Sequence, residues 1–186
     1  MYSSSYNKLF WAMIFIIFDI NLGPINIFPN FIGYMLIYSA LNELQLQHKI
    51  YEKGKMPSII LTILTIKDII HISNDNLLSG QFVSPNFWLM ALNSLILIIN
   101  IYLIYIICKG IYLLASERGL KELKDSAKNR WIAFLVVSII FIFYIPFSLN
   151  LNLQFKSSII IFVFINIMVE LLIAFLFKSS AILLKS

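Results

Sequence analysis

The feature that most constrains this chain is a stretch of 22 residues without a charge, Phe87 to Cys108. A helix that crosses the hydrocarbon core of a bilayer needs roughly 20 mostly apolar residues. Two further stretches have this character: 131–149, which begins with Trp131, and 159–177, which is uncharged except for Glu170. These stretches predict an all-α integral membrane protein.

The composition supports this class. Hydrophobic residues make up 60% of the chain and charged residues 12%, whereas soluble domains have about 45–50% and about 25%. A soluble enzyme, a disordered chain and a disulfide scaffold are therefore disfavoured. Cys108 is the single cysteine, which excludes an intramolecular disulfide and a thiolate zinc cluster. We expect it to be a small buried apolar residue.

The first half of the chain is less regular. The stretch 57–72 begins with Pro57, which a first helical turn tolerates well, and is long enough to span. The shorter apolar stretches 9–22 and 31–44 flank the Gly- and Pro-containing segment 23–30. We predict two tilted spans here, with a re-entrant hairpin as the alternative. Either arrangement gives one bundle domain over 1–186, with six predicted spans.

The basic residues orient the predicted spans, because cytoplasmic segments are enriched in Lys and Arg. With the N-terminus inside, twelve of the 14 basic residues fall in cytoplasmic segments, Lys156 falls outside and Lys67 lies in a span. We therefore predict a multi-pass protein of the cytoplasmic (inner) membrane with both termini cytoplasmic. The net charge of +5 reflects this orientation rather than nucleic-acid binding. The abundance of Lys, Ile, Asn and Phe suggests a low-GC bacterium.

The segment 109–130 is predicted to form a cytoplasmic amphipathic helix. Residues of opposite charge recur at i,i+4 spacing, as in Lys121 and Asp125. Its basic side chains would face anionic headgroups of the bilayer or, alternatively, a protein partner. These candidate contacts are Arg118, Lys121, Lys124, Lys128 and Arg130.

Known catalytic signatures are absent from the sequence, including phosphate-binding loops and the HExxH and GxSxG motifs. His48 and His71 have no second ligand at metal spacing. We expect a protein that is not an enzyme, with no catalytic residue, metal or cofactor.

Ionisable residues inside a membrane are costly and raise a functional question. Glu170 lies near the middle of its predicted span, and Asn166 lies one turn away on the same face. We expect this polar stripe to face other helices. It is either a proton or cation site or a hydrogen-bonded packing contact.

Four further candidates lie toward the outer side: Asp19, Lys67, Asp68 and His71. On a helix the last three are close enough to touch, and either Lys67 or Asp68 can pair with Asp19 from another helix. The alternative is that Lys67 extends to the outer headgroups and Asp68 follows it.

Uncharged polar residues also lie within the spans. Asn93 and Asn100 share a face of one span, and Thr62 and Thr65 lie on another. We expect hydrogen bonds between helices from these residues, with a pathway lining as the alternative. Asn30 is placed as the N-cap of the helix that follows it.

The most distinctive local sequence is DINLGPINIFPNFIGY, residues 19–34. It resembles a pattern, D-x-N-x-G-P-x-x-I-x-P-[DN]-F-I-G-Y, in uncharacterised small multi-spanning membrane proteins of low-GC Gram-positive bacteria. The resemblance covers 16 residues and implies a multi-spanning membrane protein without implying an activity.

Two functional hypotheses follow. In the first, which we favour from the sequence, the chain is an accessory, immunity or sensing subunit that acts through a membrane protein partner or as a homo-oligomer. In the second it is a small transporter or channel-like protein that handles protons or cations through Glu170.

Overall fold

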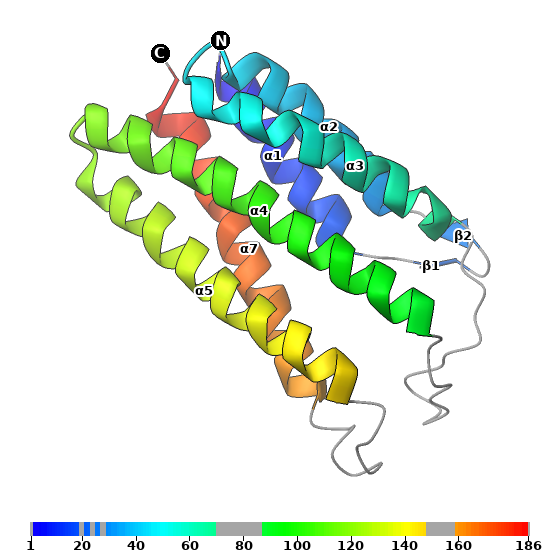
Figure 1. Ribbon diagram of the computed structural model, residues 1–186. Helices are drawn as coiled ribbons and strands as arrows, with labels where there is room; N and C mark the ends of the chain where they lie inside the picture. Colours follow the sequence, from blue (N-terminus) through cyan, green and yellow to red (C-terminus); the bar gives the residue numbers. More distant parts are fainter. Residues whose placement is uncertain are drawn as a thin grey trace.

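The described residues fold almost entirely into helices, as Figure 1 shows for a computed structural model. The structure describes residues 2–18, 21–22, 25–26, 29–69, 87–147 and 159–185. Its elements in chain order are α1 (Tyr2–Ile17), β1 (Asn21–Leu22), β2 (Ile25–Asn26), α2 (Asn30–Leu44), the 3-10 helix η1 (Lys49–Gly54), α3 (Lys55–Thr65), the 3-10 helix η2 (Ile66–Ile69), α4 (Phe87–Glu117), α5 (Lys121–Phe147) and α7 (Ile159–Leu183). The predicted helical class is confirmed.

The six α-helices form a closed circle of neighbours. Helix α1 packs between α2 and α7, α5 packs between α7 and α4, and α3 completes the circle between α2 and α4. Both chain ends lie at one end of the bundle, together with η1 and the turn from α4 to α5 (Figure 1). We call this the terminal end and the opposite one the far end. The circle encloses one shared interior.

Within the described residues, three helices are long and apolar enough to cross a membrane. They are α4, the first 24 residues of α5 and the segment Ile161–Leu183 of α7. In the most apolar 18-residue part of each, a third or less is buried against the rest of the protein. Large apolar side chains such as Phe143 and Phe164 are exposed on their outer surfaces. Apolar surface of this extent requires a nonaqueous partner. The protein is therefore a membrane protein, as predicted.

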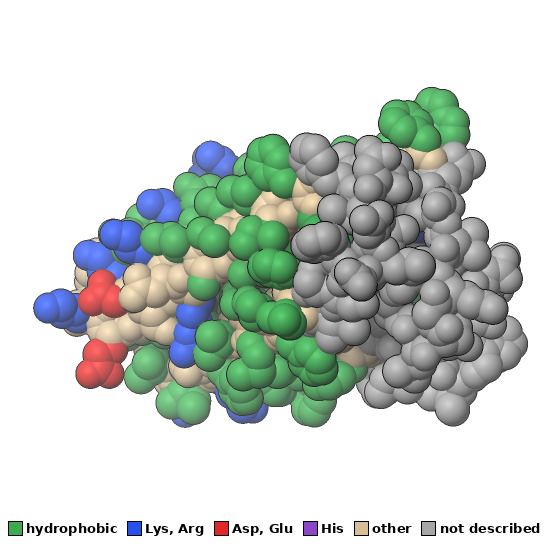
Figure 2. Space-filling model, turned by 90° about the horizontal axis from the view of Figure 1, so that it is seen from below, with side chains coloured by type: hydrophobic (Ala, Val, Ile, Leu, Met, Phe, Trp, Pro, Cys, Tyr) green, Lys and Arg blue, Asp and Glu red, His purple; other side chains and the backbone are tan. Residues whose placement is uncertain are grey.

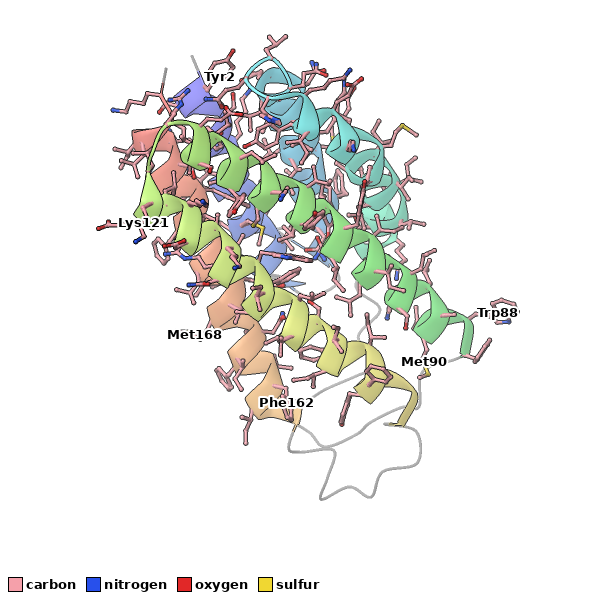
Figure 3. The ribbon with its side chains drawn as sticks, turned by 60° about the vertical axis from the view of Figure 1, so that its left-hand side comes forward. Tyr2, Trp88, Met90, Lys121, Phe162 and Met168 are labelled. Atoms are coloured by element: carbon pink, nitrogen blue, oxygen red, sulfur yellow. The ribbon has the colours of Figure 1, made fainter. Side chains whose placement is uncertain are left out.

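Polar and apolar side chains separate along the bundle. Tyr2 and Lys121 lie toward the terminal end, whereas Met90, Trp88 and Phe162 lie toward the far end (Figure 3). In Figure 2, basic and acidic side chains gather at the left-hand end of the molecule, and hydrophobic side chains cover its middle. This is the distribution that a bundle with its terminal end at a membrane surface needs.

The first two apolar stretches form helices whose bounds differ from the predicted ones mainly in α1. Helix α1 ends at Ile17 rather than at residue 22, because residues 21–22 pair instead with 25–26 in an antiparallel ladder. This ladder satisfies backbone groups that a continued helix would have bonded internally. With 16 and 15 residues, α1 and α2 are about 24 and 22 Å long. Both are shorter than a typical spanning helix.

The predicted helix over 109–130 is not present as one element. Helix α4 continues through residue 109 to Glu117, a turn follows, and α5 begins at Lys121. Gly119 has φ +71°, a left-handed conformation that ends helices and suits glycine. The two halves of the segment therefore form the tip of an antiparallel hairpin. Of the pairs that suggested a continuous helix, only Lys121 and Asp125 share a helix.

The terminal end is held by a buried polar chain. The Tyr6 hydroxyl donates to Gln47 Oε1 over 2.8 Å and accepts from the Tyr51 hydroxyl at 3.1 Å. Gln47 Nε2 donates to the Leu184 carbonyl oxygen at 3.1 Å. Side chains from α1 and η1 and the C-terminal backbone are thereby joined. Tyr51 also packs against Gly110 of α4, whose missing side chain makes room for the ring.

Candidate functional site

Glu170 faces the interior of the bundle. The fully buried residues Ile173 and Phe177 follow it at i+3 and i+7, and these positions share a helix face. Met168 and Leu172, on the other face of α7, are 60% and 44% exposed. The Glu170 carboxyl is bound by Asn166, whose Nδ2 donates to Glu170 Oε1 over 3.0 Å. The two residues of the predicted stripe therefore bond to each other within α7, whereas a hydrogen bond to another helix was expected.

A second polar group lines a pocket of about 220 Å³ between α2, the end of α3 and α4. The amide oxygens of Asn30 and Asn100 are buried and have no hydrogen-bond partner among the described residues. An unpaired buried acceptor costs about 1–3 kcal/mol, so each of these oxygens favours a hydrogen-bond donor beside it. The polar residues that line the pocket are Asn30, Tyr34, Thr65, Lys67, Asn93 and Asn100.

The pocket and the Glu170 pair lie at similar depths in the bundle. The ring of Trp131 in α5 contacts that of Tyr105 in α4 in a tilted arrangement, and the adjacent Arg130 donates from Nη1 to the Leu172 carbonyl oxygen of α7 at 2.5 Å. At 1.5 Å per residue, Asn100 lies about 7.5 Å and Asn166 about 9 Å from this level, both toward the far end. The interior of the bundle thus carries polar groups from α2, α3, α4 and α7 within one layer.

Sequence reasoning assigned Asn30 and the two threonines different roles. Asn30 is not the N-cap of α2, because Pro29 occupies that position and no side chain caps the helix. Thr62 and Thr65 donate to the carbonyl oxygens of Ser58 and Leu61 on their own helix, at 2.8 and 2.7 Å. Since these bonds stay within α3, the threonines do not link helices. The Asn30 amide is instead available to the pocket.

The other predicted polar residues are described only in part. Lys67 lies in η2, is exposed and lines the pocket. The backbone of Asp68 belongs to the same 3-10 turn, but its side chain, Asp19 and His71 lie outside the described residues. The predicted contacts among these four residues therefore remain predictions.

One ionic cluster was missed by the sequence analysis. Glu43, in the last turn of α2, accepts hydrogen bonds from Ser5 and Lys8 of α1, and Lys8 also donates to Ser39 Oγ at 3.2 Å. The available signal was Glu43 at the end of one apolar stretch and Lys8 at the start of its neighbour. The cluster lies at the terminal end and joins the first two helices.

The predicted basic contacts divide into two groups. Arg118 and Lys121 lie at the hairpin tip and are exposed, as is Lys128 on α5, while Lys124 is half-buried. Arg130 binds the α7 backbone and acts in packing. The tip thus presents positive charge away from the apolar middle of the bundle.

No group of three metal-binding side chains occurs within the described parts of the chain. Cys108 is buried in the core, where it packs as a small apolar residue. The candidate site therefore consists of the polar pocket and the Glu170 pair. Comparisons of the chain with protein-family models, curated proteins and solved structures find no match.

Proposed function

We propose that this chain is a transporter- or channel-like protein of a bacterial cytoplasmic membrane, with six crossing segments and cytoplasmic termini. The interior pocket between α2, α3 and α4 holds a small polar solute or hydrated cation that enters from the outer side, and Glu170 exchanges a proton. The observation that carries the proposal is the pair of buried amide oxygens, on Asn30 and Asn100, without a partner among the described residues.

Several features support this over the accessory role favoured from the sequence. Polar side chains from three helices line the pocket. The basic segment that was expected to form a docking helix is instead the tip of a hairpin. A mid-helix carboxyl on the inner face is costly to keep for packing alone. Twelve of the 14 basic residues lie in segments that this topology places inside.

Cysteine accessibility tests the proposal without knowledge of the solute. In a Cys108→Ala background, which removes the single cysteine, Asn100→Cys places a thiol in the pocket and Ile98→Cys places one on the lipid face. These positions are two residues apart and so point about 200° apart, and Ile98 is 52% exposed. A membrane-impermeant thiol reagent added outside intact cells is expected to label Asn100→Cys at least about tenfold faster, because only hydrated thiols ionise.

Equal labelling of the two variants from outside contradicts a hydrated pocket. Faster labelling of Asn100→Cys from the cytoplasmic side alone contradicts the proposed direction of opening. Only variants that elute from a size-exclusion column in detergent at the wild-type volume are compared, so that misfolding does not affect the labelling rates.

A second candidate role, as an accessory subunit, is favoured by the exposed basic tip of the α4–α5 hairpin. We expect charge reversal by Arg118→Glu with Lys121→Glu to release a bound cytoplasmic partner, because both residues are exposed at this tip. Mild-detergent purification from the native cell measures this, with Lys185→Glu as the matched control. A protein that purifies alone, or one that keeps its partner after the reversal, contradicts this role.

A further inference from the structure

A separate groove lies between α4 and α5, nearer the terminal end than the polar pocket. It has a volume of about 250 Å³ and combines aromatic and basic side chains. None of the described residues that line it is acidic. The lining residues are Tyr105, Cys108, Lys109, Tyr112, Ala127, Lys128, Trp131 and Ile132.

Positive charge gathers at this groove without a counter-ion. Lys109 Nζ and Lys124 Nζ lie 4.9 and 5.3 Å from the centroid of the Tyr112 ring, and Lys128 lines the groove itself. None of the three lysines forms an ion pair with a carboxylate in the described part of the chain. Two lysines that line one recess, with Lys124 beside one of its lining tyrosines, favour an anionic occupant.

The depth of the groove matches the boundary of a bilayer. Lys109 directly follows the uncharged stretch 87–108. As a helix this stretch is about 33 Å long, which is close to the thickness of a hydrocarbon core, about 30 Å. Trp131 contacts Tyr105 with ring centroids 5.0 Å apart, and Trp and Tyr are enriched at membrane interfaces. Apolar surface continues along α5 toward the far end, where Val136 is 53% exposed.

We propose that this groove binds one anionic glycerophospholipid. Its phosphate contacts the ammonium groups of Lys109 and Lys128, its glycerol ester region lies against Trp131 and Tyr105, and its acyl chains follow the apolar surface beside Val136. Basic pockets between membrane helices on the cytoplasmic side bind such headgroups. The site is distinct from the solute pocket and does not depend on the proposed transport role.

Quenching of Trp131 fluorescence by brominated lipids tests the site. Trp11→Phe with Trp88→Phe leaves Trp131 as the single tryptophan, in the full-length protein reconstituted into vesicles. The probes are brominated phosphatidylglycerol and brominated phosphatidylcholine at equal mole fractions. We expect the position beside Trp131 to bind phosphatidylglycerol about tenfold more strongly than phosphatidylcholine. Each nearby Lys contributes several-fold to the binding of an anionic lipid.

Charge-matched variants separate a site from general attraction. Lys109→Gln with Lys128→Gln is expected to lower the preference by about fivefold or more, while Lys121→Gln with Lys185→Gln lowers it less than about twofold. Equal losses in the two double variants overturn the proposal, as does equal quenching by the two lipids. Displacement of the anionic lipid by soluble glycerol phosphate overturns the lipid site in favour of a soluble ligand. A dimer that shields Trp131 from both lipids overturns the lipid site in favour of a second copy of the chain.

Discussion

Gly110→Ala is expected to lower the free energy of unfolding by about 2 kcal/mol, within the range of about 1–3 kcal/mol for added volume in a packed core. A Cβ atom at this position would lie within 2.4 Å of two carbons of the Tyr51 ring. That ring is fully buried, and its hydroxyl is hydrogen-bonded to Tyr6. The ring therefore has no free space into which to move, and α4 must shift away from η1. Equilibrium unfolding in mixed micelles of dodecyl sulfate and a mild detergent measures the loss.

A second substitution distinguishes this contact from a general effect on α4. Tyr51→Leu removes the end of the ring, so it relieves the clash while it also removes the hydrogen bond to Tyr6. The double variant should therefore lose less than the sum of the two single losses. Ser116→Ala, at an exposed position of the same helix, should stay within about 0.5 kcal/mol of the wild type. A stabilised Gly110→Ala protein, as helix propensity alone predicts, contradicts the packing argument.

The long apolar helices could be predicted because their signal is local. An uncharged stretch such as 87–108 contains enough apolar residues to define a span wherever it packs. The end of α1 could not be predicted in this way. The ladder that replaces its last turn pairs Asn21 with Asn26 and Leu22 with Ile25, and such pairing competes with a helix that the same residues can also form.

The sequence contains one residue that is typical of the turn at 118–120, but the surrounding charge pairs favoured a continuous helix. That residue is Gly119, and the charge pairs around it have i,i+4 spacing. Such pairs contribute about 0.2–0.5 kcal/mol each, whereas burial of Leu123 and Ala127 against the bundle contributes more. Packing therefore decides the direction of the chain, and weak surface pairs do not.

The pocket could not be predicted because its residues are far apart in the chain. Asn30 and Asn100 are separated by 70 positions, and they line one pocket because α3 packs against both α2 and α4. The sequence showed that each helix carries polar groups but not the order in which the helices pack. Glu170 and Asn166 could be placed on one face because they lie one turn apart, but their bond to each other within α7 differs from the expected bond to another helix.

Glu170→Gln is expected to reduce proton flux into protein-containing liposomes by at least about tenfold, because an amide cannot exchange the proton that a carboxyl within the membrane exchanges. Gln retains the length of Glu170 and can still accept the hydrogen bond from Asn166 Nδ2, so folding and thermal stability should change little. A pH-sensitive dye trapped in the liposomes reports the flux after an imposed pH difference. Met168→Leu, two residues away on the exposed face, is the matched control and should conduct as the wild type does.

Glu170→Gln and a second variant, Glu170→Leu, together separate proton exchange from packing. A carboxyl that serves only as a packing contact predicts equal flux in Glu170→Gln and wild type, and it predicts a loss of thermal stability when Glu170→Leu breaks the bond to Asn166. A proton-exchanging carboxyl instead predicts that Glu170→Gln loses proton flux while it keeps its thermal stability. Flux from the wild-type protein no greater than from empty liposomes contradicts proton handling at Glu170 outright. The pocket with Asn30 and Asn100 is then left as a solute site without proton coupling, which the cysteine labelling tests independently.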